Sequence, residues 1–279
     1  MKKWNLIVDI ENCTNCNVCT VAVQDEHVGN SFPGYSEEMP KHGHRWIEIM
    51  RKERGAGNAT DVAYLPTMCQ HCDDAPCIKS APDVVRKRPD GIVIIDPEKA
   101  KGRKDLVDSC PYGAIWWNEE KQLPQHWIFD AHLLDAGWKE PRCVTVCATK
   151  ALQSVKVDDD EMARLIDEQQ LDVFHAEYET KPRVYYKNLW RYTSSFIAGS
   201  LSGIRDHKIE CLEGVEVQLV FENQNEQIQR TDVFGDFKFD KLDAQGQTYQ
   251  VQIIDKGEMI KAIDVILVES INIGDIVLV

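Results

Sequence analysis

The cysteines of this 279-residue chain are clustered, and their spacing limits what the chain can fold around. Two groups are triplets, of the forms C-x2-C-x2-C and C-x2-C-x4-C, and the other cysteines are a Cys-Pro, a C-x3-C pair and one isolated residue. In chain order they are Cys13, Cys16 and Cys19; Cys69, Cys72 and Cys77; Cys110; Cys143 and Cys147; and Cys211. A three-cysteine loop binds one face of a [4Fe–4S] cluster, whose fourth iron takes a cysteine distant in the sequence. The spacing therefore predicts two [4Fe–4S] clusters, each with one remote ligand.

Other uses of clustered cysteines fit the spacing less well. Structural zinc is the main alternative, but zinc sites usually come as two separated pairs. Disulfides are disfavoured because no secretion signal is recognised: the apolar run after Lys2 and Lys3 is interrupted by Asp9 and Glu11. A catalytic thiol is weaker still, since no cysteine has an evident histidine partner. His71, inside the second triplet, fits either a hydrogen-bonding role or plain surface exposure.

Charge and hydropathy narrow the range of partners. The chain has 32 Lys and Arg against 46 Asp and Glu, a formal charge of −14, and this field repels phosphate backbones and anionic lipid. No window approaches the roughly 18 apolar residues that a membrane-spanning helix requires. We therefore expect a soluble, cytoplasmic protein with no nucleic-acid partner and no membrane-spanning segment.

The order of the motifs resembles a known family. The two triplets, the D-G-I-V-I-I-D segment at 90–96 and the C-P-Y-G segment at 110–113 resemble the iron–sulfur subunits of molybdopterin oxidoreductases of the dimethyl sulfoxide reductase class. Segments at 43–46, 131–135 and 181–189 are similar to the small subunits of transhydroxylases in that class, and the likeness runs nearly end to end.

The resemblance implies which cysteines share a cluster and what the chain binds. Cluster 1 would use Cys13, Cys16, Cys19 and Cys147, and cluster 2 would use Cys69, Cys72, Cys77 and Cys110. It implies a large catalytic subunit that carries molybdenum with bis-pterin guanine dinucleotide, in a heterodimer or in a higher oligomer of it. No catalytic residue is expected in this chain.

Departures from the family pattern are equally informative. A further family cluster would use four positions that here read Val23, Trp127, Asp130 and Cys143, so three of its four thiolates are absent. Valine and tryptophan cannot bind iron, and the indole fills space that a cluster needs. We expect this position to hold no cluster and to be apolar, with Cys143 packed as a small hydrophobe beside Trp127.

A fourth family cluster also lacks its ligands, because Ala81 replaces one cysteine and the segment 98–106 contains none. In the family the clusters form an electron wire, which these losses interrupt. The resemblance and the interruption together favour a redox-neutral transhydroxylation of polyhydroxylated aromatics. One alternative is a resorcinol hydroxylase or catechol dehydroxylase with net electron flow. Another is a scaffold whose clusters only brace the fold.

The expected fold class is α+β. A bacterial ferredoxin-like double-cluster domain is predicted over 1–155, a helix and extended connector over 156–196, and an all-β sandwich over 197–279. Helical spacing after an aspartate cap predicts a helix over 158–171, and the aromatics at 185–192 are expected to pack on the partner or in the core. Period-2 alternation at 215–221, 237–239 and 249–253 predicts strands, in a pattern that resembles transthyretin-like modules. Cys211 is expected to be a buried strand residue.

Overall fold

Residues 1–205, 208–222 and 224–278 are described by a computed structural model, which separates into two units. Unit 1 comprises Met1–Arg51 and Tyr64–Leu189, and unit 2 comprises Lys52–Ala63 and Trp190–Val279. The short segment in unit 2 is the tip of the hairpin formed by β2 (Ile47–Arg54) and β3 (Asp61–Met68), a contribution that the sequence did not predict. Across the described residues, no helix combines the length and apolar character needed to cross a membrane.

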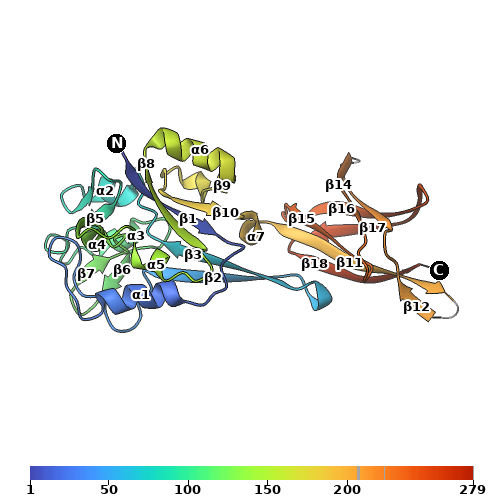
Figure 1. Cartoon of the computed structure of the whole chain (residues 1–279), viewed down its shortest axis with the longest axis horizontal. Helices are drawn as coiled ribbons and strands as arrows, with labels where there is room; N and C mark the ends of the chain where they lie inside the picture. Colours follow the sequence, from blue (N-terminus) through green and yellow to red (C-terminus); the bar gives the residue numbers. More distant parts are fainter. Residues whose placement is uncertain (206–207, 223, 279) are drawn as a thin grey trace. The chain divides into compact units, whose positions relative to one another are not determined.

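Unit 1 is organised around strand β1 (Lys3–Asp9), which is labelled in Figure 1. Its residues are buried along almost the whole strand. It pairs antiparallel with β8 (Leu152–Val157) and parallel with β10 (Val184–Lys187), and β9 (Leu171–Asp172) joins the far side of β10. In this register Val8 at the end of β1 lies opposite Leu152 at the start of β8. The loops that follow β1 and precede β8 therefore lie at the same end of the sheet.

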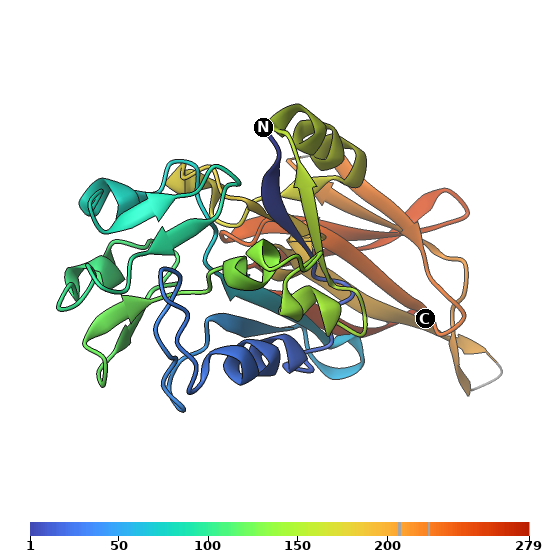
Figure 2. The same cartoon turned by 60° about the vertical axis from the view of Figure 1, so that its left-hand side comes forward.

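Helix α6 (Asp159–Gln169) covers one face of this sheet (Figure 2). Met162 of this helix packs with Ile7 and Leu171. The Asp158 carboxylate accepts the Glu161 amide at 3.0 Å, which confirms the predicted cap and helix. The other elements of unit 1 are short: α1 (Val18–His27), α2 (Pro76–Ser80), α3 (Asp105–Asp108), α4 (Ala131–Asp135), α5 (Arg142–Thr145) and the 3₁₀ turn η2 (Ala176–Tyr178), with the hairpins β4 (Val85–Lys87)–β5 (Val93–Ile95) and β6 (Trp116–Asn118)–β7 (Leu123–Gln125).

Among the aromatics for which two roles were predicted, Tyr186 of β10 belongs to the core. Its ring is fully buried, and its hydroxyl donates to the Pro66 carbonyl at 3.2 Å. The hydroxyl also accepts from the Gln70 amide at 3.3 Å. Tyr186 therefore fastens β10 to the segment that carries the second cysteine triplet.

Unit 2 contains two four-stranded sheets. In the first, β11 (Ser195–Arg205) pairs with β12 (Lys208–Cys211), β15 (Asp236–Leu242) and β18 (Ile271–Leu278). The second has the order β14 (Gln224–Arg230), β13 (Glu216–Phe221), β16 (Gln247–Asp255) and β17 (Glu258–Leu267). Alternate residues of both sheets, such as Leu201, Phe239, Leu219 and Val251, form one core. The unit also contains the 3₁₀ turn η1 (Gly57–Ala59) and helix α7 (Trp190–Thr193).

The strands predicted at 215–221, 237–239 and 249–253 are confirmed as parts of β13, β15 and β16. Short helices together with many strands confirm the α+β class. The predicted burial of Cys211 is wrong: it lies in a strand, β12, but its side chain is exposed. All four residues of β12 are exposed, since among the described residues this strand pairs with β11 alone and has no member in the core.

Candidate iron–sulfur sites

The first cysteine triplet lies where β1 ends. Cys13 and Cys16 are in the loop before α1, and Cys19 is in the first turn of that helix. Asn15 and Asn17 alternate with the cysteines and have φ of 56° and 59°, a left-handed conformation that asparagine tolerates better than most residues. The Asn17 side chain donates to the Asn15 carbonyl at 2.9 Å, which closes the loop on itself.

Cys147 lies in the connection from α5 to β8, at the same end of the sheet as this loop. The Asp9 amide donates to the Ala151 carbonyl at 2.7 Å, so the two loops are fastened at their base. Burial raises the pKa of Cys13, and the nearby Cys16 and Cys147 thiols raise it further against an opposing backbone hydrogen bond. The structure therefore brings Cys147, rather than a residue of the second group, beside the first triplet.

The second triplet follows β3 in the same way. Cys69 and Cys72 lie in the loop after this strand, and Cys77 is in the first turn of α2. Burial raises the pKa of Cys77 to about 12, with Cys110 and Cys72 adding to the effect. Burial also raises the pKa of Cys69 well above its usual value, with Cys110 as the next largest cause. Cys110, in the loop after α3, is thus close to this triplet.

The donor chemistry of both groups fits an iron–sulfur cluster. In each group, burial and neighbouring thiols oppose the ionisation of individual cysteines, such as Cys19 in the first and Cys69 in the second, and a bound metal reverses this by binding the thiolates directly. Within the described residues, no three His, Cys, Asp or Glu side chains converge as a site for a single metal ion would require. A cubane instead needs its four cysteines on four separate irons.

Several residues hold the second loop, and of these only His71 had a role suggested by the sequence. His71, between Cys69 and Cys72, has φ of 46°, and its Nδ1 accepts the Val93 amide at 3.1 Å. Lys87 donates to the carbonyls of His71 and Cys72 at 2.7 and 2.8 Å. His71 therefore has the hydrogen-bonding role that the sequence left open, since it is fully buried rather than exposed.

Thr180 is the most distant of these supporting residues along the chain. Burial raises the pKa of the Cys72 thiol, and a hydrogen bond with the Thr180 side chain opposes that effect. The Thr180 hydroxyl also lies 2.7 Å from that of Tyr112, two residues after Cys110. The only sequence signal for this role was position, because Thr180 immediately precedes the family-like segment 181–189.

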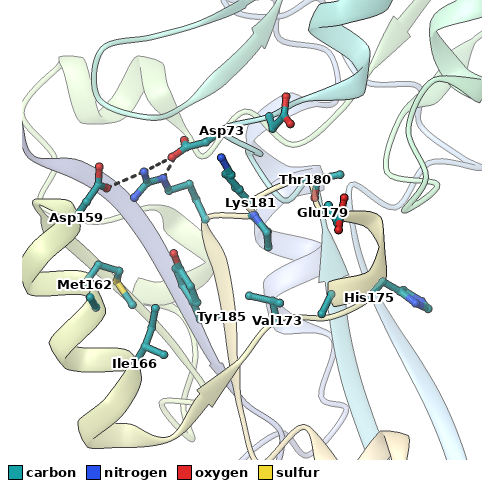
Figure 3. A pocket seen from close by; sticks show the side chains of 15 residues that line it. Asp73, Asp159, Met162, Ile166, Val173, His175, Glu179, Thr180, Lys181 and Tyr185 are labelled. Carbon is teal, nitrogen blue, oxygen red and sulfur yellow. Dashed lines mark hydrogen bonds and ion pairs between the residues drawn. The ribbon is translucent and has the colours of Figure 1, made fainter.

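A cavity of about 720 Å³ lies beside the second cysteine loop, between α6, β10 and η2. Figure 3 shows Asp73 and Asp159 at one end, joined by the guanidinium of Arg183, and the apolar Met162 and Ile166 at the other. Asp73 directly follows Cys72, so the cavity wall and the cysteine loop share a backbone segment.

The position of the further family cluster is filled by protein. Val23, Trp127, Asp130 and Cys143 are all buried, and the absence of a cluster here remains a prediction. The expectation of an apolar site is wrong. Asp130 Oδ1 faces His27 Nε2 at 3.7 Å, and both side chains are fully buried. His27 follows Val23 by one helical turn, on the same face of α1, so the sequence held a signal for it.

Cys143 is the one family thiol retained at this position. It is fully buried, as expected, and burial raises its pKa well above the usual value, with Asp130 and Cys19 adding to the effect. The position of the fourth family cluster is likewise filled. Ala81 packs with Val93 and Leu106 in an aliphatic core beside Cys77 and Cys110.

Comparison with known proteins identifies an iron–sulfur protein, and the matching family model includes the second cysteine group but begins after the first triplet. Residues 60–157 match the family described as a 4Fe-4S dicluster domain. The chain is 41% identical over 277 residues to the pyrogallol hydroxytransferase small subunit of Pelobacter acidigallici, covering 98% of each chain. It is 28% identical to a putative iron–sulfur subunit of dimethyl sulfoxide reductase from Halobacterium salinarum, over 67% of this chain and 80% of that one. It is also 28% identical to a subunit of the tetrathionate reductase of Salmonella typhimurium, over 67% and 73%.

The chain therefore belongs to the iron–sulfur subunits of the dimethyl sulfoxide reductase class of molybdopterin enzymes. Within that class it is a homologue of the pyrogallol hydroxytransferase small subunit. Its general role is that of an electron-transfer subunit with [4Fe–4S] clusters.

Proposed function

We propose that this chain is the two-cluster subunit of a molybdopterin enzyme that transfers hydroxyl groups between polyhydroxylated aromatics. The observation that carries the proposal is a total of ten cysteines, enough for two four-thiol groups and no third, in a chain related end to end to a pyrogallol hydroxytransferase subunit. The ligands are Cys13, Cys16, Cys19 and Cys147 for cluster 1, and Cys69, Cys72, Cys77 and Cys110 for cluster 2. Each cluster accepts or donates one electron when bound.

The catalytic partner is proposed to be a large subunit with molybdenum and bis-pterin guanine dinucleotide, in a cytoplasmic heterodimer or a higher oligomer of it. Substrate chemistry belongs to that subunit. In this chain, unit 1 is proposed to be ferredoxin-like and to hold the clusters, and the two sheets of unit 2 are proposed to be a transthyretin-like sandwich that enlarges the interface.

A redox-neutral reaction is supported by the two filled cluster positions. Trp127 and Val23 occupy one, and an aliphatic core around Ala81 occupies the other. Electron flow to an external carrier depends on closely spaced centres, whereas hydroxyl transfer between two aromatics needs no net electron export. The proposal therefore assigns the clusters to electron exchange within the enzyme.

Metal analysis of the anaerobically purified subunit tests the proposal. We expect about eight irons and about eight sulfides per chain, from two cubanes. Twelve irons would contradict the two-cluster count, and zinc in place of iron would contradict the ligand assignment. The second expected result is that the intact enzyme complex converts its substrates without an added electron donor or acceptor. A requirement for such a carrier would favour a hydroxylase or dehydroxylase, and full activity with both clusters locked oxidised would favour a scaffold.

A further inference from the structure

Three segments meet at the filled cluster position between α1 and α5. Val23 and His27 belong to α1, Trp127 and Asp130 end the stretch before α4, and Cys143 lies in the first turn of α5. A cluster at this position would join these segments through its ligands, because the four family positions are divided among them. In the present chain some other interaction must join them.

Asp130 makes the inner connection. Its Oδ2 accepts the backbone amide of Arg142 at 2.7 Å, which links the segment before α4 to α5. Its Oδ1 faces His27 Nε2 at 3.7 Å, which links the same segment to α1. This 3.7 Å contact is longer than a hydrogen bond, neither of the two facing atoms has a hydrogen-bond partner in the described part of the chain, and both side chains are fully buried. One carboxylate thus connects the three segments.

A second layer surrounds this connection. Glu26, next to His27 on α1, accepts from His132 Nε2 of α4 at 2.9 Å and from the guanidinium of Arg142 of α5. The same guanidinium also donates to Asp25, whose side chain is mostly exposed. The last turn of α1 is therefore bound twice to the same two neighbours, once by buried groups and once by groups nearer the surface.

Burial makes the inner pair energetically asymmetric. A buried polar group that loses its partner carries a desolvation penalty, so removal of one member penalises the fold more than removal of both. A carboxylate in a fully buried position is therefore retained only with its partners, which here are the His27 ring and the Arg142 amide.

We propose that the His27–Asp130 pair replaces an iron–sulfur cluster as the link between α1, residues 127–130 and α5. The pair and a cluster are alternative links between the same three segments. The residues at 23, 127 and 130 determine which of the two forms. This inference rests on the proposed two-cluster function, because it requires that no cluster occupies the position in the native enzyme.

A double-mutant cycle in the intact enzyme complex tests the link. We expect His27→Ala and Asp130→Ala each to lower the melting temperature under anaerobic conditions, with iron per complex unchanged. The double variant is expected to lose clearly less than the sum of the single losses. Asp25→Ala is the matched control, since it removes an exposed carboxylate of the same helix and is expected to have little effect. Additive losses, or single losses as small as that of the control, would overturn the inference.

Cysteines introduced at positions 23, 127 and 130 test whether a cluster can replace the His27–Asp130 pair as the link. Cys143 is already present, so the variant V23C/W127C/D130C completes the set. We expect it to gain about four irons per complex relative to the native enzyme and to regain stability relative to Asp130→Cys alone. A folded triple variant with unchanged iron would overturn the equivalence of the two links, and a triple variant that fails to fold would overturn it equally, while the double-mutant cycle still measures the pair.

The iron content of the native enzyme distinguishes a failure of the proposed two-cluster function from a failure of the His27–Asp130 inference. Twelve irons in the native small subunit would contradict both the two-cluster function and this inference. Eight native irons with an additive double-mutant cycle would contradict the inference alone.

Discussion

The backbone amide of Val93 donates to His71 Nδ1 at 3.1 Å, which joins the second cysteine loop to strand β5. Because Nδ1 is the acceptor, a neutral ring carries its proton on Nε2. Burial lowers the pKa of His71 well below its usual value, with His126 and Lys87 adding to the effect, so the ring is neutral. His71 therefore acts as a fixed acceptor that holds its own left-handed backbone in place between Cys69 and Cys72.

Replacement of His71 should loosen the second loop. His71→Ala leaves the buried Val93 amide without a partner, at a cost of about 1–3 kcal/mol, and places alanine in a left-handed conformation that it disfavours. We expect faster loss of about four of the eight irons when the anaerobic enzyme is exposed to a chelator. His71→Asn should retain most of the native stability, since asparagine tolerates this φ and offers a side-chain oxygen. Equal iron loss in both variants would argue against the acceptor role.

Asp73 and Arg183 form a second support for the same loop. Arg183 donates to both carboxylate oxygens of Asp73, and Lys87 lies 2.8 Å from Oδ1. Burial acts to raise the pKa of Asp73, but the hydrogen bonds from Arg183 and Lys87 outweigh it and hold the pKa below its usual range. The carboxylate is therefore ionised and anchors the loop to β10.

Asp73→Asn should destabilise the subunit by about 2 kcal/mol, the scale of a hydrogen bond to a charged group. The Arg183 guanidinium is almost buried, keeps its contacts to Asp159 and Asn5, and would lose the charge and one acceptor oxygen of residue 73. Asp74→Asn is the matched control, because Asp74 is exposed and pairs with the exposed Lys79. Anaerobic urea unfolding should show a lower midpoint for Asp73→Asn alone. An equal shift in both variants would indicate a general effect of charge.

Local patterns predicted the parts of the fold that local interactions determine. The cysteine triplets predicted two loops, because each loop contains most of its own ligands. The Asp158 cap predicted α6, since the cap and the helix are adjacent in the chain. Alternation predicted β13, β15 and β16, but it could not reveal which strand lies at a sheet edge. The exposed Cys211 on β12 shows that limit.

Contacts between distant segments left no such signal. The parallel pairing of β10 with β1 brings Thr180 and Arg183 to the second cysteine loop from more than 100 residues away. Nothing in the segment 180–183 alone indicates that contact. The His27–Asp130 pair was partly predictable from the sequence, since His27 shares a helix face with Val23. The identity of its partner depends on how α1 and α4 pack.

His126 should make the stability depend on pH. Burial lowers its pKa to about 4, against a smaller opposing hydrogen bond to the Trp127 carbonyl. An unfolded chain binds a proton to histidine near pH 6.5, so between about pH 6.5 and 4 the unfolded state carries the extra proton. Stability from this group is therefore complete above about pH 6.5 and falls as the pH is lowered, by about 1.4 kcal/mol per pH unit.

His126→Asn removes this titration while an amide can still donate to the Trp127 carbonyl, which His126 Nδ1 reaches at 2.6 Å. Anaerobic melting between pH 7.5 and 5.5 should show a smaller loss for this variant, by about 1 kcal/mol at pH 5.5. His42→Asn is the control, because His42 is exposed and its replacement should leave the native slope unchanged. A native slope in His126→Asn would contradict the burial argument.

Cys143 and Cys147 offer the sharpest test of the ligand assignment, because they are four residues apart and only one is proposed to bind iron. Cys147 lies beside Cys13, whereas Cys143 is fully buried next to Asp130 as a neutral thiol. Cys147→Ser should therefore lose cluster 1 and reduce the iron content from about eight to about four per chain. Cys143→Ser should keep both clusters and cost at most about 1–3 kcal/mol, since it places a hydroxyl in a buried position. Iron and sulfide analysis of the anaerobically purified variants, with the electron paramagnetic resonance of each reduced cluster, distinguishes the two. Loss of iron from Cys143→Ser with retention in Cys147→Ser would reverse the assignment.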